Sequence, residues 1–388
     1  MNFNPETILN YHKKKREELV EFLRKLVEIE SPSLEPKSQE PLFQIFKNEF
    51  KKLGFAINRV KGKQTGGYLF ASPQSSKPRG VRQLIIGHCD TVWPVGTLKK
   101  MPIEIGNNTI KGPGVFDMKA GLAQIIFSLR VIHELKLDIP VVPEILITSD
   151  EEIGSPESQW FIEQRAAKAD RALVLEPSLE SAGQLKTARR GVGIFQVHVE
   201  GKAAHAGLDP EKGVSAILEL SHVIQKLFQL NDPQKGISVN VGTIKGGLRT
   251  NIIAPESSAS VDVRILAADD GKRIEKTILN LKPATHGVKL SISGKIERGP
   301  MERTPRNQAL WQLAKKMGNE IGLDLQEEVS GGASDGNITS LYTATLDGLG
   351  GVGGGAHAFH EFIDIEKTIE RNALLTLLMI SPVIHKKF

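Results

Sequence analysis

Cysteine is almost absent from the sequence, which has only Cys89 among its 388 residues. A single cysteine excludes a disulfide within the chain, and such scarcity is typical of a reducing compartment. The sequence also lacks an apolar run long enough to span a bilayer, and residues 1–15 lack the apolar stretch of a secretory signal. We therefore expect a cytoplasmic protein that does not enter a membrane.

Charge of one sign is not in large excess either. The 50 Lys and Arg residues face 45 Asp and Glu residues, a net charge of +5. Because these charges are spread along the chain, we do not expect a nucleic-acid partner. Hydrophobic residues make up 40% of the chain, which is typical of a globular protein. A chain of 388 residues exceeds what one hydrophobic core usually serves, so two domains are expected.

Apolar runs that end in polar residues alternate with helical patterns in the first half of the chain. The runs are 83–87, 144–148 and 171–175, and a helical pattern covers 119–137. This alternation predicts an α/β domain built on a mostly parallel sheet. An apolar stripe before the first run predicts one helix over 5–30.

The pattern changes between residues 191 and 297. The order there is strand, helix, two strands, helix and strand, which predicts an inserted ferredoxin-like module of the βαββαβ kind. The expected domains are therefore a catalytic domain of 1–190 with 298–388, and an inserted domain of 191–297.

A histidine and an aspartate end the first apolar run. His88 and Asp90 follow Leu84-Ile85-Ile86, at the carboxyl end of a strand, where open α/β sheets place their sites. Side chains two residues apart on an extended segment share one face. We predict that His88 binds a metal while Asp90 accepts the other ring N–H. The alternative is a strand-end histidine with structural contacts alone.

Carboxylates follow the other two runs. Asp150-Glu151-Glu152 comes after 144–148, and Glu176 comes after 171–175. Like charges near a core are costly unless cations neutralise them. Asp117 lies in a glycine-rich loop that opens a helix, where it either caps that helix or bridges two cations. A solvated acidic loop is the alternative for 150–152.

Two histidines, His357 and His360, occupy a glycine-rich loop near the C-terminus. Residues 348–353 satisfy G-x-G-x-x-G, but the loop runs into histidines instead of opening the helix of a βαβ unit, so we reject a dinucleotide site. A set of five N and O ligands without a thiolate emerges: His88, Asp117, Glu152, Glu176 and one late histidine. Such ligands suit two divalent ions, zinc first, with cobalt or manganese as alternatives. Two such ions roughly 3.5–4 Å apart polarise a carbonyl and lower the pKa of a bridging water.

In their order along the chain, these motifs resemble the M20 family of dinuclear zinc peptidases and deacylases, and within it the glutamate carboxypeptidase-like branch. The resemblance covers nearly the whole chain, including the inserted module. It implies that Asp117 bridges the metals, that Glu151 is the general base and that Glu152 is a ligand. Glu176 stands where several deacylases carry aspartate, which favours peptidase chemistry.

The same resemblance selects His357 as the last ligand, because Glu361 follows it four positions later. His360 departs from the family pattern and stays the alternative ligand.

The inserted module resembles the family's lid and dimerisation domain, which implies a homodimer. His205 matches a histidine that reaches a neighbouring active site and stabilises the oxyanion; the alternative is a turn-capping role. Asn251 and Arg264 resemble lid residues that grip a substrate carboxylate, which an arginine fork does bidentately. On a strand face, the alternative for Arg264 is a surface ion pair.

The resulting hypothesis is hydrolysis of an amide or peptide bond next to a free carboxylate, in a small peptide or acyl-amino acid. This is the reaction of a carboxypeptidase or dipeptidase, with glutamate release as one form. Glu151 takes a proton from the metal-bridging water and passes it to the leaving nitrogen.

Three alternatives remain open. They are an N-acyl amino acid deacylase, such as an acetylornithine deacetylase or aminoacylase, a catalytically silent metal-binding homologue, and a covalent hydrolase with Cys89 as nucleophile and His88 as base. Adjacent residues on a strand point to opposite faces, which argues against the last.

Overall fold

The computed structural model describes residues 4–74, 80–179 and 181–383. The chain forms two compact units, which we describe separately. Unit 1 comprises Met1–Thr187, Arg303–Ser330 and Ser334–Phe388, and unit 2 comprises Ala188–Glu302 and Gly331–Ala333. Within the described ranges, no helix is both long and apolar enough to cross a bilayer.

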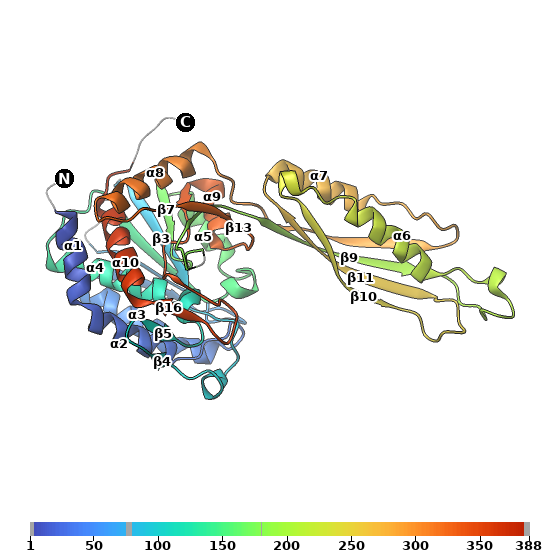
Figure 1. Cartoon of the computed structure of the whole chain (residues 1–388), viewed down its shortest axis with the longest axis horizontal. Helices are drawn as coiled ribbons and strands as arrows, with labels where there is room; N and C mark the ends of the chain where they lie inside the picture. The colour runs from blue at the N-terminus through green and yellow to red at the C-terminus, as the bar shows by residue number, and fades with distance from the viewer. Residues whose placement is uncertain (1–3, 75–79, 180, 384–388) are drawn as a thin grey trace. The chain divides into compact units, whose positions relative to one another are not determined.

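Unit 1 is built on a six-stranded sheet with the order β1-β2-β6-β3-β7-β14. Strands β3 and β7 of this sheet are labelled in Figure 1. Its strands are β1 (Phe55–Val60), β2 (Tyr68–Pro73), β3 (Arg82–His88), β6 (Val142–Thr148), β7 (Arg171–Val174) and β14 (Ala344–Leu346). Strands β6, β3, β7 and β14 run parallel, and β1 and β2 add an antiparallel hairpin at one edge. The predicted α/β fold on a mostly parallel sheet is confirmed.

Helices cover both faces of this sheet, so its central strands are apolar throughout. One face packs against α1 (Pro5–Lys14), α2 (Arg16–Val27), α3 (Pro36–Lys52), α4 (Ala120–Glu134), α8 (Pro305–Asn319) and α10 (Ile365–Ile380). The other face packs against α5 (Gln159–Ala166) and α9 (Asp335–Tyr342). Successive strand residues alternate between the two cores, with Ile85 in the first and Leu84 and Ile86 in the second.

The prediction of one helix over 5–30 is wrong, because α1 and α2 are separate helices with a break at Lys15. The run Lys13-Lys14-Lys15 supplies no apolar side chain at the point where the stripe would have to continue.

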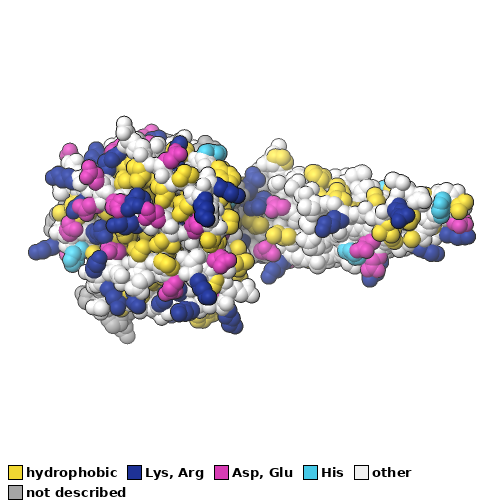
Figure 2. Space-filling view, turned by 90° about the horizontal axis from the view of Figure 1, so that it is seen from below, with side chains coloured by type: hydrophobic (Ala, Val, Ile, Leu, Met, Phe, Trp, Pro, Cys, Tyr) yellow, Lys and Arg dark blue, Asp and Glu magenta, His cyan; other side chains and the backbone are white. Residues whose placement is uncertain are grey.

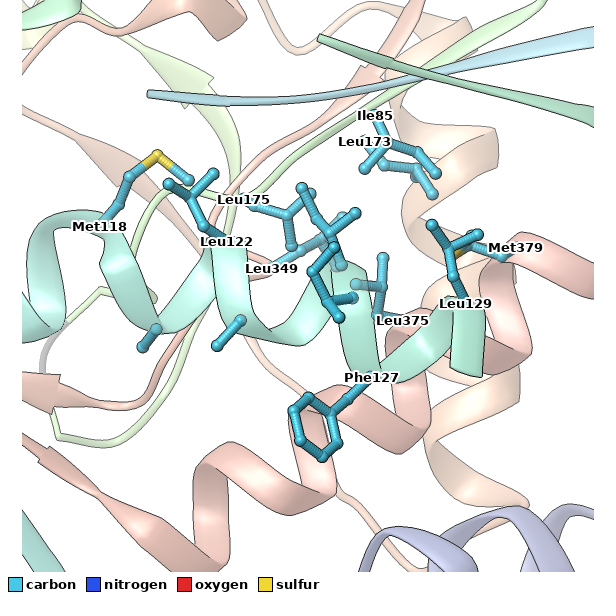
Figure 3. Close-up of a cluster of buried hydrophobic side chains, with 14 of the residues drawn as sticks. Ile85, Met118, Leu122, Phe127, Leu129, Leu173, Leu175, Leu349, Leu375 and Met379 are labelled. Carbon is cyan, nitrogen blue, oxygen red and sulfur yellow. The ribbon is translucent and has the colours of Figure 1, made fainter. Parts of the chain in front are cut away.

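Helix α4 lies at the centre of the larger core (Figure 3). Leu122 and Leu129 of α4 lie in one buried cluster with Ile85 of β3 and Leu375 of α10. Because α4 is apolar around most of its circumference, it is buried almost completely. Its position fixes the loop that precedes it, which carries Asp117.

A small second sheet joins two loops of unit 1. Its order is β15-β16-β5-β4, with β4 (Glu104–Ile105), β5 (Thr109–Lys111), β15 (Gly353–Gly354) and β16 (Phe362–Asp364). Strands β16 and β5 pair side by side, so the loop after β5 and the loop before β16 leave from neighbouring positions. A separate pair is formed by β8 (Leu185–Arg189) and β13 (Glu327–Ser330).

Unit 2 is a four-stranded antiparallel sheet with two helices. The strands are β9 (Gly191–Glu200), β10 (Ser238–Gly246), β11 (Glu256–Ile265) and β12 (Lys289–Arg298), and the helices are α6 (Ala216–Phe228) and α7 (Ala268–Leu279). The strand order β10-β11-β9-β12 and the βαββαβ chain order are those of a ferredoxin-like module.

Basic and acidic side chains are interspersed over both units on the face shown in Figure 2.

Candidate active site

Three neighbouring parallel strands end at the same edge of the main sheet. His88 is the last residue of β3, Asp150-Glu151-Glu152 follows β6, and Glu176 follows β7 two residues after its end. Because β3 lies between β6 and β7, their polar ends gather on one sheet edge, the position at which open α/β sheets bind ligands. Apolar runs that are buried on both faces therefore hold these side chains in place.

Asp117 lies between two histidines and offers one carboxylate oxygen to each. Its Oδ1 is 3.2 Å from His88 Nε2, and its Oδ2 is 3.4 Å from His357 Nε2. A second carboxylate completes each side: Glu176 Oε1 lies 3.4 Å from His88 Nε2, and Glu152 Oε2 lies 3.2 Å from His357 Nε2. The arrangement is thus two histidine–carboxylate pairs on either side of one shared carboxylate.

Asp117 does not cap the following helix. Helix α4 begins at Ala120, its N-cap is Lys119, and no side chain caps it. Asp117 instead lies in an irregular turn with φ of −111° and ψ of 96°, which directs its carboxylate toward the histidines. Of the two interpretations in the sequence, helix capping is therefore excluded.

The ligand atoms form two overlapping groups of three. One group is His88, Asp117 and Glu152, the other is His88, Glu151 and Glu176, and within each group the atoms lie within 4.8 Å of one another. Glu151 is thus as close to His88 and Glu176 as a metal ligand would be. Its position fits both a base beside the metals and a ligand.

A buried carboxylate holds the turn that carries both glutamates. Asp90 is fully buried and accepts hydrogen bonds from the backbone N–H groups of Glu151 (3.3 Å) and Glu152 (3.2 Å). Ser33 Oγ donates to the same carboxylate at 2.6 Å. The nearer acceptor for His88 Nδ1 is the backbone carbonyl of Asp90, at 3.0 Å, with Asp90 Oδ1 at 3.4 Å. This contact leaves Nε2 of a neutral ring as the ligand atom.

Burial and these contacts shift the pKa values of the cluster. Although burial disfavours a charged ring, contacts with Asp117 and two further carboxylates raise the pKa of His88 well above its ordinary value. Contacts with Asp117 and Glu152 raise the pKa of His357 to about 10. Burial, reinforced by Asp117, raises the pKa of Glu152 to about 7. The carboxylates therefore draw positive charge to the histidines, and a divalent cation bound by the same atoms would supply that charge instead.

Three buried ligand atoms indicate that the residues fit a metal. Within the described ranges, His88 Nε2, Asp117 Oδ1 and Glu152 Oε1 are buried without a hydrogen-bond partner. Buried polar atoms normally have partners, and these three point into one cluster of nitrogen and oxygen ligands. The donor set and its orphaned atoms fit divalent metal ions that accept histidine and carboxylate ligands.

The glycine-rich loop near the C-terminus presents one histidine to this cluster. His357 has a positive φ of 61°, a conformation uncommon for a side chain other than glycine, and its ring contacts Asp117 and Glu152. His360 is exposed. The structure thus places His357 in the cluster.

In unit 2, His205 and Asn251 lie together. His205 pairs with Ile252 in a β-bridge, and Ala206 N donates to Asn251 O at 3.0 Å. His205 Nδ1 accepts hydrogen bonds from the backbone N–H groups of Gly207 and Leu208, both at 3.1 Å. In a neutral ring the proton is therefore on Nε2. His205 therefore caps a turn and, being exposed, also has an Nε2 donor for another group.

Arg264 lies at the opposite end of strand β11. Asn251 precedes the start of β11 at Glu256, and Arg264 is next to its last residue. At roughly 3.3 Å per strand residue, Glu256 and Arg264 are about 26 Å apart. Arg264 forms a bidentate ion pair with Asp262, at 2.8 and 2.9 Å. One chain therefore does not bring Arg264 and Asn251 to the same carboxylate.

Cys89 has no access to a substrate. Its side chain is fully buried in the larger core, and burial raises the pKa of its thiol. A neutral, buried thiol is not a nucleophile.

Two residues that organise the site have no recognisable pattern in the sequence. Ser33 is a lone serine after Ser31-Pro32, and its Oγ donates to Asp90. Trp93 donates its indole N–H to Glu361 at 3.0 Å, across 268 residues of sequence.

The fold and this cluster define a class of protein, the α/β metallohydrolases with a histidine–carboxylate site at the sheet edge and a second α+β unit. Comparison with known proteins agrees. A family model of the M20 peptidase dimerisation domain matches residues 187–282. The chain is therefore a homologue of the M20 metallopeptidases, and it is a hydrolase with peptidase or deacylase activity.

The relatives of the chain include a peptidase and a deacylase. Carboxypeptidase G2 of Pseudomonas sp. (strain RS-16) is 29% identical over 358 residues, which cover 89% of this chain and 85% of that protein. Acetylornithine deacetylase of Photorhabdus laumondii is 30% identical over 59% of this chain and 62% of its own length. The crystal structure of aminopeptidase PepT from Bacillus cereus has the same fold, with a TM-score of 0.77 and 22% identity over 94% of this chain and 98% of that one.

Proposed function

We propose that this chain is a two-metal carboxypeptidase or dipeptidase of the glutamate carboxypeptidase-like branch, which cleaves an amide bond next to a free carboxylate. The observation that carries the proposal is Asp117, which offers one oxygen to His88 and the other to His357. A carboxylate shared in this way is suited to hold two cations close together.

The proposed ligands divide between two metals. His88 and Glu176 would hold one, His357 and Glu152 would hold the other, and Asp117 would be shared between them. Histidine and carboxylate ligands without thiolate suit zinc, which we propose, as well as cobalt and manganese. Bound metals would polarise the scissile carbonyl and lower the pKa of a water between them.

Glu151 is proposed as the general base. It lies in the turn held by Asp90 and is partly exposed, so a water and a substrate can reach it. Its carboxylate would take a proton from the attacking water and deliver it to the leaving nitrogen. Such a base contributes about 10²–10⁴-fold to the rate.

Substrate binding by unit 2 is proposed to involve two chains. Asn251 precedes the start of β11 and Arg264 lies near its end, so both can grip one carboxylate only if they belong to different copies. The matched dimerisation domain supports a homodimer. We propose that His205 and Asn251 of one copy act at the site of the other, where the His205 Nε2–H would stabilise developing negative charge.

The substrate is proposed to be a small peptide or N-acyl amino acid with a free carboxylate. The similarity to carboxypeptidase G2 over 89% of the chain supports the peptidase alternative. Glu176 supports it too, because it stands where several deacylases carry aspartate. The acetylornithine deacetylases among its relatives support the second candidate, an N-acyl amino acid deacylase. Hydrolysis rates on C-terminal glutamate dipeptides and on N-acetyl amino acids, before and after chelation, decide between them. Failure of the reconstituted protein to cleave either class would refute the proposal.

The adjacent glutamates provide a matched pair of variants. Glu151→Gln should lower kcat by about 10²–10⁴-fold and leave the metal content per chain unchanged, because it removes a base. Glu152→Gln should lower the metal content itself, because it removes a ligand. Metal analysis alongside steady-state kinetics measures both. Loss of metal from Glu151→Gln would show that Glu151 is a ligand and not the base.

A further inference from the structure

Glu361 is a buried carboxylate that four N–H groups surround. Its side chain is fully buried. Oε2 accepts from Gly114 N at 2.8 Å and Trp93 Nε1 at 3.0 Å, and Oε1 accepts from Phe116 N at 2.9 Å and Asp117 N at 3.0 Å. A carboxylate has about four lone-pair positions, and all four are used. Glu361 therefore has no position left for a metal or for a proton of the substrate.

The four donors come from two separate segments that flank the site. Trp93 lies in the loop that follows His88 and Asp90, whereas Gly114, Phe116 and Asp117 belong to one turn. Glu361 itself ends the loop that carries His357, four residues earlier. One side chain thus connects the three loops that supply ligands on both sides of Asp117.

Backbone contacts make this connection tight. Gly112 N donates to Glu361 O at 3.3 Å, and the adjoining strands β5 and β16 are paired. Gly114 has a positive φ of 73°, and a Cβ there would lie 2.5 Å from Thr91 Cγ2. These contacts restrict the backbone of the turn around Asp117, and the bonds that Glu361 accepts then determine where Asp117 lies.

We propose that Glu361 is a positioning residue that sets the spacing between Asp117 and His357, and that it thereby fixes how the two proposed metal sites share one carboxylate. This inference rests on the proposed roles of Asp117 and His357 as ligands. Glu361 holds Asp117 by accepting from the Asp117 backbone N–H. It holds His357 through residues 358–360, which connect the two, and it does not itself touch a metal.

Glu361→Gln tests the proposal with almost no change in volume. An amide in place of the carboxylate turns one acceptor oxygen into a donor, which then faces two N–H groups. A matched control is Glu219→Gln in unit 2, because Glu219 is also fully buried and accepts backbone N–H groups, from Ala284 at 3.0 Å and Thr285 at 2.7 Å. Glu219 is part of unit 2, whereas the three loops belong to unit 1.

The measurement is titration of the metal-free full-length protein with Co²⁺, followed by the visible absorption of the bound ion. This spectrum reports ligand geometry and does not depend on turnover. Loss of an outer partner of a metal ligand typically lowers metal affinity by about 10–100-fold, so we expect a loss of that size for Glu361→Gln, with an altered spectrum. Glu219→Gln should match the wild type in both.

Trp93→Phe provides a second variant that removes one donor and introduces none. It should weaken Co²⁺ binding less than Glu361→Gln does, in the same direction. Wild-type affinity and spectrum in Glu361→Gln would overturn the inference and leave the proposed function intact. If Glu361→Gln does not fold, wild-type behaviour of Trp93→Phe overturns it. A wild-type protein that binds no Co²⁺ would overturn the proposed function, and this inference with it.

Discussion

The buried imidazole of His12 makes the free energy of unfolding of unit 1 depend on pH. The ring lies in α1, is 2% exposed, and has Nε2 2.9 Å from Thr376 Oγ1 of α10. Because the Thr376 hydroxyl donates to Asn372 O at 2.9 Å, its oxygen accepts from His12, which places the proton on Nε2. Within the described ranges, His12 Nδ1 has no hydrogen-bond partner. Burial lowers the pKa of His12 to about 3.

The sign of the effect follows from the two states. The unfolded imidazole has a pKa near 6.5, so between about pH 6.5 and 3 the unfolded chain binds a proton that the folded chain does not. The free energy of unfolding is therefore highest above pH 6.5 and falls as the pH is lowered. At pH 5 the loss is about 2 kcal/mol, and it approaches about 5 kcal/mol below pH 3. The loss at pH 5 is set by the pKa of His12 in the unfolded chain. Any pKa below about 4 in the folded chain gives nearly the same loss.

Urea unfolding at pH 7 and pH 5 measures this difference in the metal-free protein, where acid cannot act by releasing metal. Trp93, Trp160 and Trp311 all lie in unit 1, so tryptophan emission follows the unfolding of that unit. His12→Gln retains a donor for Thr376 and does not titrate. The wild type should lose about 2 kcal/mol more than this variant between the two pH values.

A matched control is His133→Gln, since His133 is exposed near the end of α4. It should keep the pH dependence of the wild type. Equal pH dependence of the wild type and His12→Gln would refute the reasoning, because it would mean that His12 is protonated in the folded state.

Two further predictions concern the residues around the metal cluster. Asp90→Asn should lower kcat and metal affinity by about 10–100-fold, because at least one of the Glu151 and Glu152 N–H groups loses its acceptor. Ser33→Ala removes only the 2.6 Å bond to Asp90 and should have a smaller effect on the same two measurements; an effect larger than that of Asp90→Asn would contradict this order. Cys89→Ser should leave kcat/KM within about twofold of the wild type, because the thiol is buried, and an inactive variant would bring back the nucleophile alternative.

Local sequence patterns determined the fold and most of the cluster. The apolar runs before His88, Glu152 and Glu176 predicted strands of one sheet, and the carboxyl ends of neighbouring parallel strands necessarily meet at one edge. Strand and helix periods depend on residues a few positions apart, so they can be read without a structure. The βαββαβ order of unit 2 was predicted for the same reason.

Only the tertiary structure decided contacts between distant segments. It directed Asp117 toward two histidines instead of the helix end, brought His357 to the cluster, and placed Asn251 beside His205. The bond between Asp117 N and Glu361 spans 244 residues. No local period encodes such a bond, because its geometry depends on how α4, β5 and β16 pack, and this packing is set by the whole chain.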